Sequence, residues 1–217
     1  MQQIVSHLTR QYAERTTPKQ NGAYWYSKEI YENIIPHIKT KRPWVLINIP
    51  YKCYDHAIVF IHSNLNPIRY IWLSDYKDLI LVCSQHETVD KMIKWFPQSH
   101  IVYLPLSIDV KYVSKFKRKR KTKEIAFAGR LSKCPKYIDQ QGIDILGGIE
   151  REDLLKELGK YKKVYAVGRC ALEARCLGCE ILPYDPRYPD DRWHLYDNKD
   201  VIPMLQNILN EIDGTVV

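Results

Sequence analysis

The sequence predicts an α/β fold built from two Rossmann-like halves, each with a parallel sheet and with a ligand cleft between them. Apolar, β-branched runs alternate along the chain with segments whose apolar residues repeat at helical spacing. The runs are almost continuously apolar, as in strands covered on both faces. A basic segment at 115–123 interrupts the alternation and divides it into two series. The predicted ranges are 1–112 for the N-terminal half, 113–123 for a basic linker and 124–217 for the C-terminal half.

The elements of the first half follow from these two patterns. Apolar runs such as WVLINIP and LILVCS predict four strands, at 44–50, 57–62, 79–84 and 100–106. Helical spacing of apolar residues predicts helices at 24–38 and 87–96.

The second half also alternates predicted strands with predicted helices. Runs such as EIAFAG and KVYAVG predict strands at 124–129, 163–168 and 179–185. Helices are predicted at 150–161, 169–177 and 201–212. We expect the last helix to pack back across the two halves.

Composition narrows the class of protein. The 217 residues are 45% hydrophobic and 12% aromatic, enough for a buried core and too apolar for a disordered chain. Nine glycines and twelve prolines exclude collagen-like and low-complexity classes. No apolar run approaches the roughly 20 residues that span a bilayer, and residues 1–10 lack the apolar core of a signal peptide. We therefore expect a soluble, cytoplasmic protein without a transmembrane segment.

Positive charge is concentrated in one place. Lys and Arg number 33 against 25 Asp and Glu, a net charge of +8, and the sequence KFKRKRKTK at 115–123 holds seven of the positive charges and no acidic residue. Two interpretations stay open and are compatible: a solvated linker, or a patch that contacts phosphates or an acidic partner.

The six cysteines lie mostly in apolar stretches, as buried free thiols do. Cys176 and Cys179 have the spacing of half a zinc site, which Cys134 and Cys170 would have to complete. No second Cys-x-x-Cys or His-x-x-x-His pair follows them, so we predict no metal site.

Two predicted strands end in residues suited to an anion. Gly129 and Arg130 close the strand at 124–129, where a glycine allows close backbone approach and an arginine matches phosphate oxygens. Gly168 closes the strand at 163–168 and precedes a helix whose N-terminal amides favour an anion. Glu173 stands four residues after Arg169, so it either pairs with that arginine or points at a ligand's ribose hydroxyls.

Other candidates have weaker local patterns. Gly22 precedes the first predicted helix, where it is either a plain turn or a point of close approach for a small ligand. His62 ends a predicted strand, where it is either a hydrogen-bonded loop residue or a general base. The chain has no Gly-x-Ser-x-Gly elbow, Walker lysine loop or Gly-x-Gly-x-x-Gly fingerprint, which argues against hydrolase, P-loop and dinucleotide classes.

Taken in order, these segments resemble the two-domain GT-B glycosyltransferases, in particular the retaining group that includes glycogen-synthase-like and lipopolysaccharide enzymes, in a shortened form. The resemblance is carried by Gly22 with AYWYSKEIYENI, by LILVCSQHETVDKMIKWFP, by PLSID at 105–109, by FAGRL at 127–131 and by GRCALEARCLGCEILPYD.

The resemblance implies transfer of a sugar from a UDP- or GDP-sugar donor, with no further cofactor required. It implies an acceptor-side first half and a nucleotide-sugar-binding second half, with the oligomeric state left open. The acceptor-side residues would be Gly22 and Tyr24, with His62 as the catalytic base. The donor-binding residues would be Gly129, Arg130, Lys136, Gly168, Arg169, Cys170 and Glu173, with Glu173 on the ribose. The positive charge implies an anionic acceptor, either a modified base in DNA or a polymer at a membrane surface, and a matching location at one of the two.

The sequence departs from the family pattern at three positions. Ser107 replaces a usual glycine, Pro135 stands where a lysine is expected with Lys136 one residue later, and Tyr165 replaces the first acid of the family's Glu-x7-Glu pair. The loss of the first acid at Tyr165 supports an alternative function: a non-catalytic module that binds nucleotide or nucleic acid on a reduced glycosyltransferase-like fold.

Overall fold

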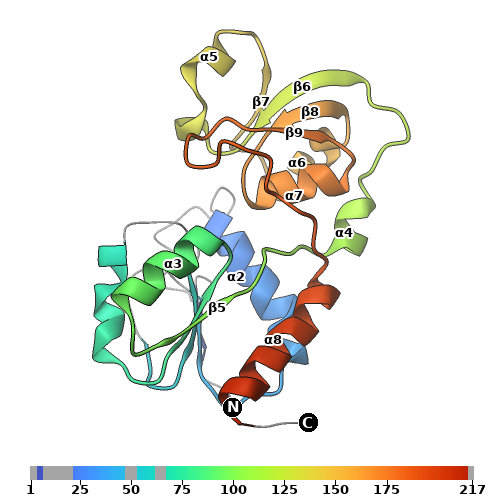
Figure 1. Cartoon of the computed structure of the whole chain (residues 1–217). Coiled ribbons are helices and arrows are strands. Elements are labelled where there is room, and N and C mark those ends of the chain that lie inside the picture. Colours follow the sequence, from blue (N-terminus) through green and yellow to red (C-terminus); the bar gives the residue numbers. More distant parts are fainter. Residues whose placement is uncertain (1–3, 7–21, 47–52, 62–66, 215–217) are drawn as a thin grey trace. The chain divides into compact units, whose positions relative to one another are not determined.

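The chain forms two compact α/β units, coloured along the sequence in Figure 1. The computed structural model describes residues 4–6, 22–46, 53–61 and 67–214. Unit 1 includes 23–105 and the chain from Lys199 onward, whereas unit 2 contains the continuous stretch Leu106–Asn198. These bounds differ from the predicted ranges in two ways. The basic segment lies inside unit 2 rather than between the halves, and the last helix belongs to unit 1 rather than to the second half.

Unit 1 contains a five-stranded sheet with the order β1-β2-β3-β4-β5, in which every neighbouring pair is parallel. The strands are β1 (Ile4–Ser6), β2 (Trp44–Leu46), β3 (Ile58–Ile61), β4 (Ile80–Cys83) and β5 (His100–Tyr103). The last four begin within the predicted runs, and β1 was not predicted as a strand. All residues of β2, β3 and β4 are buried, which confirms strands covered on both faces.

The helices of unit 1 match three of the predicted segments. The segment 24–38 holds α2 (Gly22–Asn33) and the 3₁₀ turn η2 (Ile35–His37), and α3 (His86–Trp95) matches 87–96. The final helix α8 (Asn198–Ile212) matches 201–212. The 3₁₀ helix η3 (Pro67–Asp75) was not predicted. Gln206 of α8 accepts a hydrogen bond from the Lys39 amide at 2.6 Å and thereby ties the helix to unit 1.

Charged side chains cluster where the strands of unit 1 begin. Asp78 Oδ2 accepts from Arg42 Nη1 at 3.0 Å and lies 2.7 Å from His56 Nδ1, while Asp78 Oδ1 lies 3.6 Å from His100 Nε2. Arg42 also pairs with Asp213, just beyond α8, at 2.7 Å. The hydrogen bond from His56, and then the bond and charge of Arg42, lower the pKa of Asp78. The cluster links the starts of four strands, β2 to β5, to the end of α8.

The lowered pKa of Asp78 gives stability a defined pH dependence. The ionised carboxylate stabilises the folded chain above the unfolded-state pKa of about 3.9, and the gain is lost as pH falls through the lower folded-state pKa. Asp78→Asn should therefore reduce stability at pH 7 by about 1 kcal/mol or less, because the group is partly exposed. Asparagine tolerates the positive φ of residue 78. Thermal denaturation from pH 7 to pH 2 should show the difference vanishing in acid, and Asp90→Asn on α3 is the exposed control.

Unit 2 contains a four-stranded parallel sheet with the order β7-β6-β8-β9. The strands are β6 (Lys123–Ala128), β7 (Asp144–Leu146), β8 (Tyr161–Tyr165) and β9 (Glu180–Leu182). The strand β7 was not predicted, whereas the other three overlap predicted runs. The chain passes from β6 to β7, and then back to the other side of β6 for β8.

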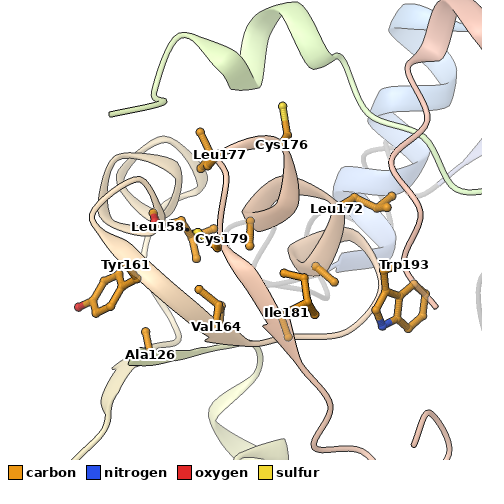
Figure 2. Close-up of a cluster of buried hydrophobic side chains, with 14 of the residues drawn as sticks. Ala126, Leu158, Tyr161, Val164, Leu172, Cys176, Leu177, Cys179, Ile181 and Trp193 are labelled. Atoms are coloured by element: carbon orange, nitrogen blue, oxygen red, sulfur yellow. Dashed lines mark hydrogen bonds between the residues drawn. The ribbon is translucent and has the colours of Figure 1, made fainter. Parts of the chain in front are cut away.

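The helices α6 (Arg151–Leu158) and α7 (Arg169–Cys176) were predicted, and they lie together beside the sheet in Figure 1. Three short elements were not predicted: α4 (Val110–Ser114), η4 (Leu131–Lys133) and α5 (Lys136–Asp139). The core of unit 2, drawn in Figure 2, joins Val164 and Ile181 of the sheet to Leu158 and Leu172 of the helices. Cys176 points towards α4 in the same view, with its sulfur 3.4 Å from the Ser114 hydroxyl.

The two ends of unit 2 are joined to each other. Ser107 Oγ donates to Asn198 Oδ1 at 2.8 Å, and Ile108 forms a parallel bridge with Asp197. The first and last residues of unit 2 therefore lie next to each other. None of the described helices is both long enough and apolar enough to cross a membrane.

Candidate functional site

The strand order of unit 2 creates a topological switch point. Connections leave β6 towards β7 and leave β8 towards β9, so the chain departs in opposite directions from two neighbouring strands. In open parallel sheets, ligands bind beyond the carboxyl ends of such a strand pair. Gly129 and Arg130 follow β6 directly, and Gly168 follows β8 and caps α7. Four predicted donor-site residues (Gly129, Arg130, Gly168 and Arg169) thus stand at one edge of one sheet.

The backbone at Gly168 is open to a ligand. Its φ of 61° and ψ of −135° are accessible to glycine and costly for other residues. Among the described residues, no atom lies within 4 Å of a Cβ built at this position. The first amides of α7, at Arg169 and Cys170, point out of the helix end as those of any α-helix do. The macrodipole of α7 adds a partial positive charge there.

Three cations gather on the loops that follow β6 and β9. The pKa of Lys133 is lowered by burial and by the positive charges of Arg187 and Arg130. Arg187 forms a two-pronged pair with Asp185, with Nε to Oδ1 at 2.9 Å and Nη2 to Oδ2 at 2.5 Å. The hydrogen bond from Arg187 lowers the pKa of Asp185. Asp185 offsets the charge of Arg187 and acts on Lys133, while Arg130 adds a further positive charge beside Lys133, and this excess of positive charge favours an anion.

Aromatic rings lie beside the cations. Phe127 of β6 meets Tyr184 edge-on, with ring centroids 5.0 Å apart. A Cβ at Gly129 would lie 3.1 Å from the Phe127 ring and 3.4 Å from the Tyr184 hydroxyl. Burial raises the pKa of Tyr184, as does the nearby carboxylate of Asp185. The backbone at Gly129, which leads to Arg130, therefore packs against the side chains of Phe127 and Tyr184.

Glu173 is a buried counter-charge for two arginines. The side chain is 2% exposed, and Oε1 accepts from Arg169 Nε at 2.9 Å and from Arg151 Nε at 3.1 Å. The pair with Arg169 is the one that the four-residue spacing predicts. Arg151 begins α6, 22 residues earlier, and no local pattern connects it to Glu173. The contact of Glu173 with a ribose stays a prediction, and a carboxylate this buried would have to gain exposure to make it.

Cys170 lies beside this ionic cluster. Burial, followed by the negative charge of Glu173, raises the pKa of the Cys170 thiol to about 12. The thiol is therefore protonated near neutral pH and is a poor nucleophile. Its contribution to a ligand site would be shape and the backbone amide.

Four of the predicted site residues remain: Lys136, Gly22, Tyr24 and His62. Lys136 begins α5 and is exposed. Gly22 begins α2, where Tyr24 packs edge-on against Trp25 at 5.3 Å. His62 lies outside the described residues, and the cleft predicted between the halves stays a prediction.

Within the described residues, no three His, Cys, Asp or Glu side chains come together to hold a metal ion. The cysteines at 134, 170, 176 and 179, whose spacing left a zinc site open, are free thiols, and no three of them lie together.

Arg151, Asp185 and Arg187 were not among the predicted site residues. Lys133, which follows Arg130 by three residues, is a cation that the sequence places beside the predicted anion site. A signal also existed for Arg187, which follows Asp185 by two residues. Comparison with known proteins gives no family: no protein-family model and no curated protein matches the chain.

Proposed function

We propose that unit 2 binds the diphosphate of a nucleotide beyond the ends of β6 and β8, and that the protein transfers a sugar from a nucleotide-sugar donor to an acceptor. The observation that carries the proposal is the convergence at the switch point of Gly129 and Arg130, of Gly168 with the start of α7, and of Lys133. Arg187 lies near Lys133 and is paired with Asp185. Phosphate suits all of these groups.

The same residues suit the chemistry of a departing nucleoside diphosphate. When the bond between the sugar's anomeric carbon and the phosphate oxygen breaks, that oxygen gains negative charge. Arg130 and Lys133 would stabilise this charge, and the amides after Gly168 would hold a second phosphate oxygen. The acceptor oxygen forms the new bond and gives up its proton, for which His62 is the proposed base. The chemistry requires no covalent bond to the protein.

A second function is favoured by one residue. Tyr165, at the carboxyl end of β8, replaces the first acid of the Glu-x7-Glu pair of the glycosyltransferases that the chain resembles. A module that binds nucleotide without turnover would tolerate this change. A thermal-shift panel of nucleoside diphosphates and nucleotide sugars, followed by a donor-hydrolysis assay, separates the functions. Stabilisation with hydrolysis supports the transferase, stabilisation without turnover supports the module, and no stabilisation contradicts both.

Arg130→Ala should weaken binding of the stabilising nucleoside diphosphate by about tenfold or more, because a charge-assisted hydrogen bond contributes about 1.5–3 kcal/mol. Arg130→Lys should have an affinity between those of Arg130→Ala and the wild type, since lysine keeps the positive charge but lacks the paired N–H donors of the guanidinium group. Isothermal titration calorimetry gives the affinities. The matched control is Arg69→Ala on η3 in unit 1, an exposed arginine whose loss should change nothing. Equal affinity of Arg130→Ala and the wild type would remove Arg130 from the site.

A further inference from the structure

The basic segment 115–123 stands at the opposite edge of the unit 2 sheet from Arg130. It leads into β6, whose 6 residues carry the chain to Gly129. At about 3.3 Å per residue, β6 separates the two ends by about 20 Å. Two positive regions therefore lie on unit 2: the candidate phosphate site at the carboxyl ends of the strands, and the basic segment at their amino ends.

The basic segment is held in place by the fold. Phe116 packs against the core of unit 2, and the Thr122 amide donates to the Lys160 carbonyl at 2.9 Å. Lys121 Nζ donates at 2.6 Å to the carbonyl of Leu177, which caps the C-terminus of α7. Lysine at a helix C-terminus is favourable because it opposes the negative end of the macrodipole. The segment therefore displays its cations from anchored backbone rather than from a loose tail.

The carboxylates around the segment are paired with Lys123 at its end and with lysines outside it. Four ion pairs occupy them: Lys123 with Asp144, Lys162 with Glu124, Lys160 with Glu157, and Lys163 with Glu180. Five exposed cations remain in the segment: Lys115, Lys117, Arg118, Lys119 and Arg120. Across the described part of the chain, no ion pair joins these five to a carboxylate. Their charge is thus left for a partner to neutralise.

We propose that this basic segment binds the phosphate backbone of a nucleic acid, without reading base sequence. Closely spaced lysines and arginines match the charge density of a duplex, and arginine forks match phosphate oxygens. A membrane is the poorer match, because stable binding to a bilayer takes a second signal besides positive charge, such as an inserted apolar face or a lipid anchor. The one apolar residue of the segment, Phe116, is packed against the core.

The experiment measures binding of a fluorescent duplex DNA by anisotropy, at several salt concentrations from about 50 to about 200 mM. Neutralising four or five phosphates predicts an affinity loss on the order of 10²-fold across this range. The variant K117Q/R118Q/K119Q/R120Q should bind at least about tenfold more weakly and show a flatter salt dependence. Its melting temperature should match the wild type, because the replaced head groups are exposed.

A matched control variant distinguishes the effect of where the cations are removed from the effect of the change in net charge. The variant K41Q/R69Q/K77Q/K94Q removes four exposed cations from unit 1 and has the same net charge. It should keep most of the duplex affinity. Equal losses in the two variants would overturn the proposal, as would undetectable or salt-independent binding to duplex. Tighter binding to vesicles with about one third anionic lipid than to duplex would identify a membrane surface instead.

This proposal does not depend on the nucleotide site, and the two can fail separately. Because the sites lie at opposite edges of the sheet, saturating nucleoside diphosphate should leave duplex binding unchanged. The quadruple variant of the segment should keep its thermal shift with nucleoside diphosphate. Displacement of duplex by nucleoside diphosphate would contradict a separate surface.

Discussion

Glu173→Ala should destabilise unit 2 by about 3–5 kcal/mol, the cost of removing one partner from a buried ionic cluster. The carboxylate is 2% exposed, and the side chains of its partners Arg151 and Arg169 are only 16% and 11% exposed. Without Glu173, two positive charges would remain close together in a poorly hydrated place. Urea denaturation, followed by circular dichroism, gives the change in unfolding free energy.

Two further variants test the explanation. Glu173→Gln should cost less than Glu173→Ala, because the amide oxygen still accepts a hydrogen bond from an arginine. Replacing Glu173 with Leu, and both arginines with Met, should recover much of the loss, since no unpaired charge remains. A Glu173→Ala loss below about 1 kcal/mol would mean that the cluster is worth no more than a surface ion pair. Nucleoside diphosphate affinity in Glu173→Gln, measured on folded protein, tests the ribose contact separately.

Gly159→Ala should destabilise unit 2 by about 1–3 kcal/mol through overpacking. Gly159 caps α6, and a Cβ there would lie 2.5 Å from the Phe116 carbonyl oxygen. Backbone cannot rotate away as a side chain can, so the start of the basic segment would have to move. Thermal denaturation gives the loss. Limited trypsin digestion should then show faster cleavage within 115–123, because an anchored segment has been loosened.

Gly142→Ala is the control for this variant. Its φ of 65° disfavours alanine, but a Cβ at that position would meet no atom within 4 Å. It should lower stability by about 1 kcal/mol without altering trypsin cleavage at 115–123. Equal cleavage in both variants would contradict the role of Gly159 in seating the segment.

The sequence was most informative where a strand lies in a long apolar run and is covered on both faces. WVL and ILVC belong to continuous apolar runs, and both became fully buried strands. The missed strands β1 and β7 lie in short stretches that polar residues interrupt, QQIVSH and GIDIL, so no continuous apolar run stands out. Strand order was also beyond prediction, because nothing in the chain says on which side of β6 the strand at 161–165 will pair. The switch point depends on that order.

The contacts of the candidate site also divide into those that the sequence could predict and those that it could not. Contacts within a turn or a strand end were predictable, such as Arg169 with Glu173 four residues later. The approach of Arg151 to Glu173 was not, since it depends on how α6 packs beside α7. The basic segment was correctly identified as a run of charge. Its place inside unit 2 depends on the packing of α4 against α7. The helix α4 has five residues, too few for an apolar pattern to predict that packing.

The joined ends of unit 2 have a consequence for synthesis. All residues of 106–198 leave the ribosome before α8, which unit 1 needs for its contacts at Lys39 and Arg42. Domains fold as units once their residues have emerged. Unit 2 can therefore fold while unit 1 still lacks its last helix, although unit 1 begins earlier in the chain. Slow translation of the codons for α8 would prolong the interval in which a finished unit is attached to an incomplete one.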